Sequence, residues 1–170
     1  IITGMANQPV ASGIDQSKET IKLSNVVKDT NQSSVDRISA FEDIINIEVG
    51  DTSLSRARNI EREIDLRQIY LKFEGGNPSG THKDRIAFAQ CLDALRRGFN
   101  TVAVATCGNY GVSMALASNL AGLRCMIYIP ENYHTKRFEE MENLGATIIR
   151  VKGNYEHTVM FSRKKAKKNE

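Results

Sequence analysis

The sequence is poor in aromatic residues and has no long hydrophobic run. It contains no tryptophan, and aromatic residues make up only 6% of its 170 residues. The longest apolar runs, at residues 101–105 and 125–129, are far shorter than the roughly 18 residues that a membrane span needs. With 41% apolar residues, the chain still holds enough hydrophobic material for one domain of ordinary size. We therefore expect a soluble globular protein without a membrane partner.

Cysteine and histidine are also scarce. The three cysteines are Cys91, Cys107 and Cys125, and the three histidines are His82, His134 and His157. The cysteines are odd in number and widely separated, so the sequence predicts neither a disulfide framework nor a structural zinc site. The histidines have no partners at ligand spacing, so we expect no metal. Free thiols and the lack of a secretory signal pattern predict a cytoplasmic protein.

Most of the chain has no excess of charge of one sign. The net charge is +3, but the residues before Phe161 carry a net charge of −1, and the excess comes from basic residues near the C-terminus. These are Arg163, Lys164, Lys165, Lys167 and Lys168. A nucleic-acid-binding surface spreads basic side chains over a domain, so we expect no nucleic-acid partner.

The first 50 residues have no sustained hydrophobic period. Residues 1–33 mix small and polar residues with isolated apolar ones, which predicts an irregular leader. Ser33 or Ser34 is a candidate N-cap for a short helix through Val35, Ile38 and Phe41. Residues 44–49 have the apolar content of a strand, and residues 50–52 are typical of a turn.

From residue 68 onward, predicted strands and helices alternate. The strands cover residues 68–74, 101–105, 125–129 and 147–151, and the helices cover residues 83–97, 110–120, 135–144 and 156–168. Gly98 and Gly122 mark two of the helix ends. Such alternation requires right-handed crossovers and a parallel sheet covered on both faces. The predicted fold class is therefore α/β, with three layers and a parallel sheet.

The first candidate for chemistry is a glycine-rich segment, residues 74–82, which we call the lysine loop because it delivers Lys83 to the first turn of a predicted helix. A helix N-terminus disfavours positive charge, so an amine there is closer to a free nucleophile. A free amine is what a covalent bond to an aldehyde cofactor requires. The alternative is an ordinary N-terminal lysine that points into solvent.

The second candidate is the turn between a predicted buried strand and a helix, with the sequence Thr-Cys-Gly-Asn-Tyr-Gly at residues 106–111. We call residues 106–110 the anion loop, because free backbone N–H groups and hydroxyls in such a turn can hold a phosphate or a carboxylate. The alternative is that Asn109 only caps the helix.

Together the two loops resemble a known family. Residues 50–168 resemble the N-terminal half of the fold type II pyridoxal-phosphate enzymes, the tryptophan synthase β family. Residues 77–85, Asn-Pro-Ser-Gly-Thr-His-Lys-Asp-Arg, are similar to the Schiff-base motif of threonine synthase and cysteine synthase. Residues 106–111 are similar to their Ser/Thr-Ser-Gly-Asn-Thr-Gly loop. Residues 49–54 resemble the Gly-x-Thr-Pro-Leu segment that opens the fold, with Ser53 in place of proline.

The resemblance implies a role for each matching residue. Lys83 would bind pyridoxal 5'-phosphate covalently and later move the substrate α-proton, and Asn109 would donate a hydrogen bond to the phenolic oxygen of the cofactor. The residues that would bind the substrate α-carboxylate are Thr106, Cys107, Gly108, Asn109 and Tyr110. The substrate would be a small amino acid, and the full-length protein would be a homodimer.

The resemblance also implies a domain organisation. Residues 1–45 would be a partly irregular leader, and residues 46–108 would begin the large domain with its Schiff-base lysine. Residues 109–153 would form a small mobile subdomain, and residues 154–170 would be a helix leading to a C-terminal half. That half holds the phosphate-binding loop and the partner of the pyridine nitrogen in this family. We therefore expect this sequence to be an N-terminal fragment of a longer chain.

Departures from the family patterns favour one activity. Val104 stands where tryptophan synthase β has a glutamate, and Asp84 follows the lysine, unlike the usual dehydratase pattern. Gly80 and residues 74–76 are most similar to threonine synthase, a lyase that converts O-phosphohomoserine and water to threonine and phosphate. Two alternatives stay open: replacement at the β-carbon, as in cysteine synthase, and a noncatalytic protein that keeps the fold. A Rossmann domain is disfavoured because no Gly-x-Gly-x-x-Gly follows a strand.

Overall fold

Helices and short strands alternate along the chain in the computed structural model, which describes residues 17–167. The helices are α1 (Lys18–Lys28), α2 (Ser34–Glu48), α3 (Arg58–Glu63), α4 (Lys83–Arg96), α5 (Asn109–Ala121), α6 (Phe138–Asn143) and α7 (Tyr155–Lys167), with a 3-10 turn, η1 (Glu74–Gly76). The strands are β1 (Leu54–Arg56), β2 (Tyr70–Lys72), β3 (Thr101–Ala105), β4 (Arg124–Pro130) and β5 (Thr147–Val151). No helix in this part of the chain has the length and apolar content needed to cross a membrane.

The centre of the fold is a parallel sheet in the order β3-β4-β5. Val102 of β3 lies opposite Cys125 of β4, and Ile127 of β4 lies opposite Ile148 of β5. The predicted strands at residues 101–105 and 147–151 are confirmed at both ends, and so is the α/β fold class. The predicted mobile subdomain shares this sheet with β3, and its movement stays a prediction.

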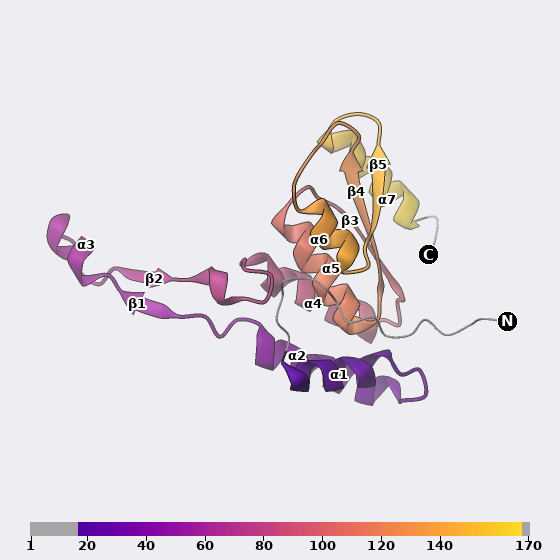
Figure 1. Cartoon of the computed structure of the whole chain (residues 1–170), viewed down its shortest axis with the longest axis horizontal. Coiled ribbons are helices and arrows are strands. Elements are labelled where there is room, and N and C mark those ends of the chain that lie inside the picture. Colours follow the sequence, from indigo (N-terminus) through magenta and orange to yellow (C-terminus); the bar gives the residue numbers. More distant parts are fainter. Residues whose placement is uncertain (1–16, 168–170) are drawn as a thin grey trace.

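Side chains of β4 show how the layers lie. Ile127 and Ile129 are buried in the core with α4 and α5, whereas Tyr128, which points to the other face, lies 6.0 Å from the ring of Phe161 on α7. Helix α7 therefore covers the sheet on the side opposite α5 (Figure 1). Strand β3 is only half-buried along its length, because it is the edge strand of the sheet within residues 17–167.

Part of the predicted irregular leader is a helix. Ser17 caps α1 by accepting a hydrogen bond from the Thr20 N–H at 3.0 Å. The buried face of α1 consists of Thr20, Ser24 and Val27, and Ser24 donates to the Leu120 carbonyl of α5 at 3.0 Å. Two of these three residues are polar, so the sequence shows no apolar period there. Residues 1–16 of the predicted leader lie outside the described residues.

The helix predicted to begin near Ser33 is confirmed, but the strand predicted at residues 44–49 is wrong. Ser33 Oγ accepts from the Asp36 N–H, and α2 continues without a break to Glu48. Phe41 and Ile44 are both fully buried on one face of α2. The ring of Phe41 stacks on that of Phe88 in α4, with the centroids 6.0 Å apart. This packing outweighs the strand preference of the isoleucines.

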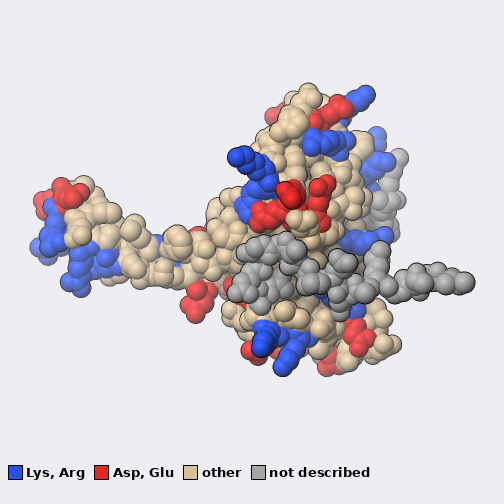
Figure 2. Space-filling model, in the orientation of Figure 1, with Lys and Arg blue, Asp and Glu red and all other residues tan. Residues whose placement is uncertain are grey.

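An arm, residues 54–73, extends away from the rest of the structure (Figure 1). Strands β1 and β2 pair antiparallel in it, with Leu54 opposite Lys72 and α3 between them. Only the centre of the strand predicted at residues 68–74 is confirmed, and neither β1 nor α3 was predicted, because they are too short to show a period. The apolar side chains that are more than half exposed on the arm are Leu54, Ile64, Leu66, Tyr70, Leu71 and Phe73. Charged side chains of both signs gather at its far end (Figure 2).

The helices that flank the sheet follow the predictions with shifts at their ends. Helix α4 begins at Lys83 as predicted, and α5 ends before Gly122, whose φ of +67° is the left-handed conformation that stops a helix. Helix α6 is shorter than the predicted range of residues 135–144. The reason is that the Arg137 N–H donates to Thr135 Oγ1 at 3.3 Å, which forms a turn ahead of the helix.

Truncating the stacked ring on α2 should strongly destabilise the fold. Phe41→Ala removes a fully buried side chain, and we expect a loss of about 3–5 kcal/mol in the free energy of unfolding by chemical denaturation. The control is Ile47→Ala on the same helix, where the side chain is 42% exposed. Equal losses in the two variants would contradict the packing of α2 against α4.

Candidate functional site

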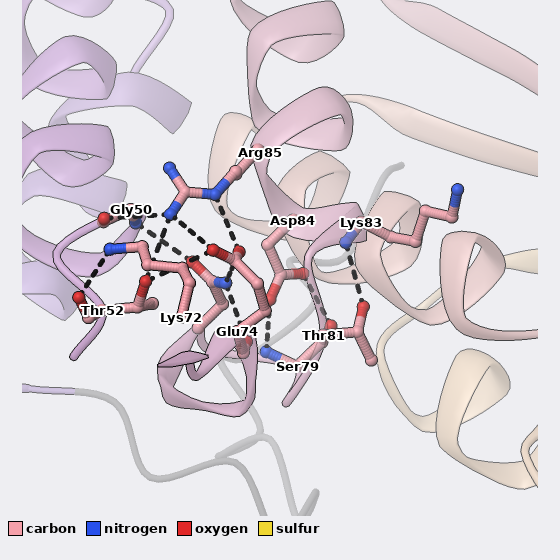
Figure 3. Close-up of polar contacts among 10 residues, drawn as sticks. Gly50, Thr52, Lys72, Glu74, Ser79, Thr81, Lys83, Asp84 and Arg85 are labelled. Carbon is pink, nitrogen blue, oxygen red and sulfur yellow. Dashed lines mark hydrogen bonds and ion pairs between the residues drawn. The ribbon is translucent and has the colours of Figure 1, made fainter. Parts of the chain in front are cut away.

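Lys83 is the first residue of α4, directly after the lysine loop. Its backbone N–H donates to Thr81 Oγ1 at 3.1 Å, and the side chain of His82 is exposed and does not cap the helix. The Lys83 amine makes no hydrogen bond or ion pair within residues 17–167, and its side chain extends away from the neighbouring Glu74 and Arg85 (Figure 3). The amine is therefore available to a ligand.

The position of Lys83 is set by the next residue, Asp84. This carboxylate is fully buried, and it accepts hydrogen bonds from the Ser79 N–H at 2.8 Å and from Ser79 Oγ at 2.6 Å. Ser79 Oγ also lies 2.9 Å from Ser113 Oγ on α5. Hydrogen bonds to a charged group are among the strong ones. They bind the lysine loop to the first turn of α4 and, through Ser113, to α5.

A second cluster holds the start of the lysine loop. Arg85 donates from Nε to Glu74 Oε2 at 2.8 Å and from Nη2 to Glu74 Oε1 at 3.0 Å (Figure 3). Asn77 donates to the same Glu74 carboxylate at 2.9 Å and accepts from the Gly50 N–H at 3.0 Å. The Arg85 guanidinium holds the pKa of Glu74 at about 2, well below its ordinary value. The cluster therefore joins the residues before the arm to the lysine loop.

The anion loop leads from β3 into α5. The Thr106 N–H donates to the Tyr128 carbonyl at 3.2 Å, which extends the pairing of β3 with β4. The next backbone N–H groups find no acceptor among the described residues; they belong to Cys107, Gly108, Asn109 and Tyr110. Free N–H groups at the N-terminus of a helix attract an anion. The arrangement therefore suits a carboxylate or a phosphate, and the binding of either stays a prediction.

The side chains of the anion loop differ in the hydrogen bonds that they can donate to a ligand. Burial raises the pKa of the Cys107 thiol, so at neutral pH it is protonated and can donate a weak hydrogen bond where a serine would use its hydroxyl. Burial also raises the pKa of Tyr110, and its hydroxyl is bonded to Gln90 of α4. Tyr110 can therefore serve an anion through its backbone N–H, while its hydroxyl ties α5 to α4.

The two loops, far apart in the sequence, meet through Arg137. Its Nη1 donates to Asn109 Oδ1 at 2.6 Å, and its Nη2 lies 3.4 Å from the Ser79 carbonyl oxygen in the lysine loop. No sequence pattern singles out Arg137, because a basic residue before a short helix looks like any solvated charge. With the bond between Ser79 and Ser113, this contact places both predicted loops at one site.

Helix α6 can reach the anion loop because Gly111 has no side chain. A Cβ atom at Gly111 would lie 2.7 Å from Cε of Met141, a fully buried side chain of α6. A Cβ atom there would push aside the end of the Met141 side chain, so glycine allows this close approach without such a shift. The final glycine of the 106–111 motif therefore lets α6 pack on the first turn of α5.

Other chemistry has little support in the described part of the chain. No group of three or more His, Cys, Asp or Glu side chains in it could hold a metal ion. Burial raises the pKa of Cys91 to about 12 and that of Cys125 to about 11, so neither thiol is a nucleophile.

Comparison with known proteins relates most of the chain to one enzyme family. Residues 45–170 match the family model described as pyridoxal-phosphate dependent enzyme. A threonine synthase of Methanocaldococcus jannaschii is 32% identical over 125 residues, which cover 73% of this chain and 31% of the relative. A cystathionine beta-synthase of Apis mellifera is 36% identical over 108 residues, which cover 61% of this chain and 21% of the relative.

A solved structure shares the fold over part of its length. A pyridoxal 5'-phosphate-dependent aspartate racemase superposes with a TM-score of 0.63 and 28% identity, covering 76% of this chain and 42% of that structure. The chain therefore spans less than half of this structure and about a third or less of the two curated relatives.

The Glu74 cluster should make stability depend on acid. A carboxylate whose pKa is lowered by folding stabilises the fold fully above its unfolded pKa, and this contribution disappears as the pH falls through the folded value. We expect the free energy of unfolding to fall between about pH 4.5 and about pH 2, and to fall less steeply in Glu74→Gln. Urea denaturation over this range measures the effect. The control is Glu139→Gln, an exposed carboxylate, and parallel curves for all three proteins would refute the prediction.

Proposed function

We propose, because the chain belongs to the family of pyridoxal-phosphate dependent enzymes, that the full-length protein binds pyridoxal phosphate through Lys83 and acts on an amino acid. The observation behind the proposal is that the Lys83 amine has no partner among the described residues, while Arg137 links the lysine loop at Ser79 to Asn109 in a loop of free N–H donors.

The residues of the site fit this cofactor. When bound, pyridoxal phosphate supplies an aldehyde that bonds to amines and a ring that stabilises negative charge on a neighbouring carbon. Lys83 provides the amine. Asn109 provides a side-chain Nδ2 that has no acceptor among residues 17–167, which suits the phenolic oxygen of the ring. The free N–H groups of the anion loop suit the carboxylate of an amino acid.

We assign each part of the site a task in the reaction. The anion loop binds the substrate carboxylate through backbone N–H groups, with the Cys107 thiol as a further donor. Lys83 Nζ accepts the proton of the substrate α-carbon and returns a proton later in the reaction. The hydrogen bonds of Asp84 to Ser79 keep Lys83 at the start of α4 while this happens.

Within this class, threonine synthase is the activity that we favour. It would convert O-phosphohomoserine and water to threonine and phosphate. The support is the segment Glu-Gly-Gly-Asn-Pro-Ser-Gly at residues 74–80, which is most similar to threonine synthase, and the archaeal relative of that name. The direct assay supplies the full-length protein with O-phosphohomoserine and cofactor. Threonine and phosphate released in equal amounts would support the activity, and no release of either would refute it.

Replacement at the β-carbon is the second candidate. The similarity to a cystathionine beta-synthase is as high as that to threonine synthase, and both activities can use the same lysine and anion loop. An assay with a serine derivative that carries a leaving group on the β-oxygen, together with a thiol, distinguishes the two candidates. A new carbon–sulfur bond without turnover of O-phosphohomoserine would favour the second candidate.

Removing the amine should abolish cofactor binding. We expect the full-length protein to show cofactor absorbance in the visible or near ultraviolet, and Lys83→Ala to lose this absorbance and roughly 10²–10⁴-fold in turnover. The matched control is Lys136→Ala, which removes an exposed lysine next to Arg137 and should keep both. Full absorbance in Lys83→Ala, or its loss in Lys136→Ala, would show that the cofactor is attached elsewhere.

A further inference from the structure

We propose that Arg137 is a positioning residue that holds the side-chain amide of Asn109 with its N–H donors directed to the cofactor. The inference rests on the proposed function, and it adds a residue that neither the sequence motifs nor the two predicted loops include. The observation behind it is the 2.6 Å hydrogen bond from Arg137 Nη1 to Asn109 Oδ1.

The chemistry of the amide makes this contact directional. The oxygen of an asparagine side chain accepts hydrogen bonds and its nitrogen donates them, whereas a guanidinium can only donate. Arg137 therefore selects the orientation of Asn109 in which Oδ1 faces it. The flipped amide would place donor against donor. In the selected orientation, Nδ2 is left without an acceptor among residues 17–167 and is free to donate to a ligand.

Arg137 can impose this orientation because it is itself held from several sides. Its Nε and Nη2 donate to the two oxygens of Glu140 at 2.9 and 3.1 Å, which is the bidentate geometry of a fixed ion pair. Its backbone N–H is bonded to Thr135, and its side chain is 28% exposed. The buried Met141, packed against Gly111, fixes α6 on the first turn of α5. The guanidinium is therefore a rigid part of the site.

The same guanidinium also lies against the lysine loop. Its Nη2 is 3.4 Å from the Ser79 carbonyl, and Ser79 is the residue that Asp84 holds. The orientation of Asn109 is thus coupled to the loop that positions Lys83. Arg137 would thereby link Lys83, which attaches the cofactor, to Asn109, which donates to the phenolic oxygen of the cofactor ring.

Arg150 provides a matched control. Its guanidinium donates to the carbonyls of Glu131 and Tyr133 and lies 5.2 Å from the centroid of the Phe138 ring. It therefore supports the same segment of chain and the same helix as Arg137. It makes no hydrogen bond to either loop of the site within the described residues.

The test uses the full-length protein loaded with pyridoxal phosphate, and its readout is the ratio of the longer- to the shorter-wavelength absorption band of the bound cofactor. A donated N–H stabilises the ionised phenolic oxygen, so its loss should weaken the longer-wavelength band. We expect Arg137→Gln to lower the ratio about 3- to 10-fold, the size expected for one hydrogen bond. Asn109→Ala should lower it in the same direction, and the double variant should not go beyond Asn109→Ala. Arg137→Lys, whose ammonium can only donate as the guanidinium does, whereas the amide of Arg137→Gln can also accept, should lie between wild type and Arg137→Gln.

The remaining outcomes overturn the proposal. A wild-type ratio in Arg137→Gln would refute a positioning role while leaving cofactor binding by Lys83 intact. An equal change in Arg150→Gln would show that the effect is only structural. If Arg137→Gln fails to fold, a wild-type ratio in a folded Arg137→Lys protein, where an intermediate ratio is expected, would refute the positioning role. A wild-type protein that takes up no cofactor would overturn this inference together with the proposed function.

Discussion

The site depends on a buried carboxylate. Asp84 is fully enclosed, and a charge in such a place is costly unless strong hydrogen bonds satisfy it. Both of its oxygens are bonded to Ser79, five residues earlier in the chain. The lysine loop must therefore close back on the start of α4. Lys83, which directly precedes Asp84, is carried to the helix N-terminus by this closure.

The same contacts connect the site to the fold. Ser79 reaches Ser113, so the closed lysine loop rests on α5, the helix into which the anion loop leads. Helix α5 is buried on nearly all sides, between the sheet and the helices α1 and α4. Each loop thus begins a helix whose body belongs to the hydrophobic core. Rigid helices that present their N-termini to one point are a suitable basis for a site that binds anionic groups.

Sequence patterns predicted those parts of the structure that depend on local chemistry. Glycine-rich turns between strand and helix predicted the lysine loop and the anion loop, a continuous apolar run predicted β3, and the alternation of strands and helices predicted β5. The same reasoning failed where contacts between residues far apart in the sequence determine the local structure. Helix α1 buries Thr20 and Ser24, so its pattern looks irregular, and α2 remains helical past Ile44 because Phe41 packs on α4. Arg137 joins the site through a partner 28 residues away in the chain, which no local pattern indicates.

We propose that this fold delivers one particular amine, that of Lys83, to the cofactor. The most direct measurement is borohydride reduction of the full-length protein with bound pyridoxal phosphate, followed by peptide mapping by mass spectrometry. We expect the reduced cofactor on Lys83, whose amine is free of partners among the described residues. A label on Lys72, whose amine is bonded to the Thr52 carbonyl at 2.6 Å, or on Lys136 would contradict it.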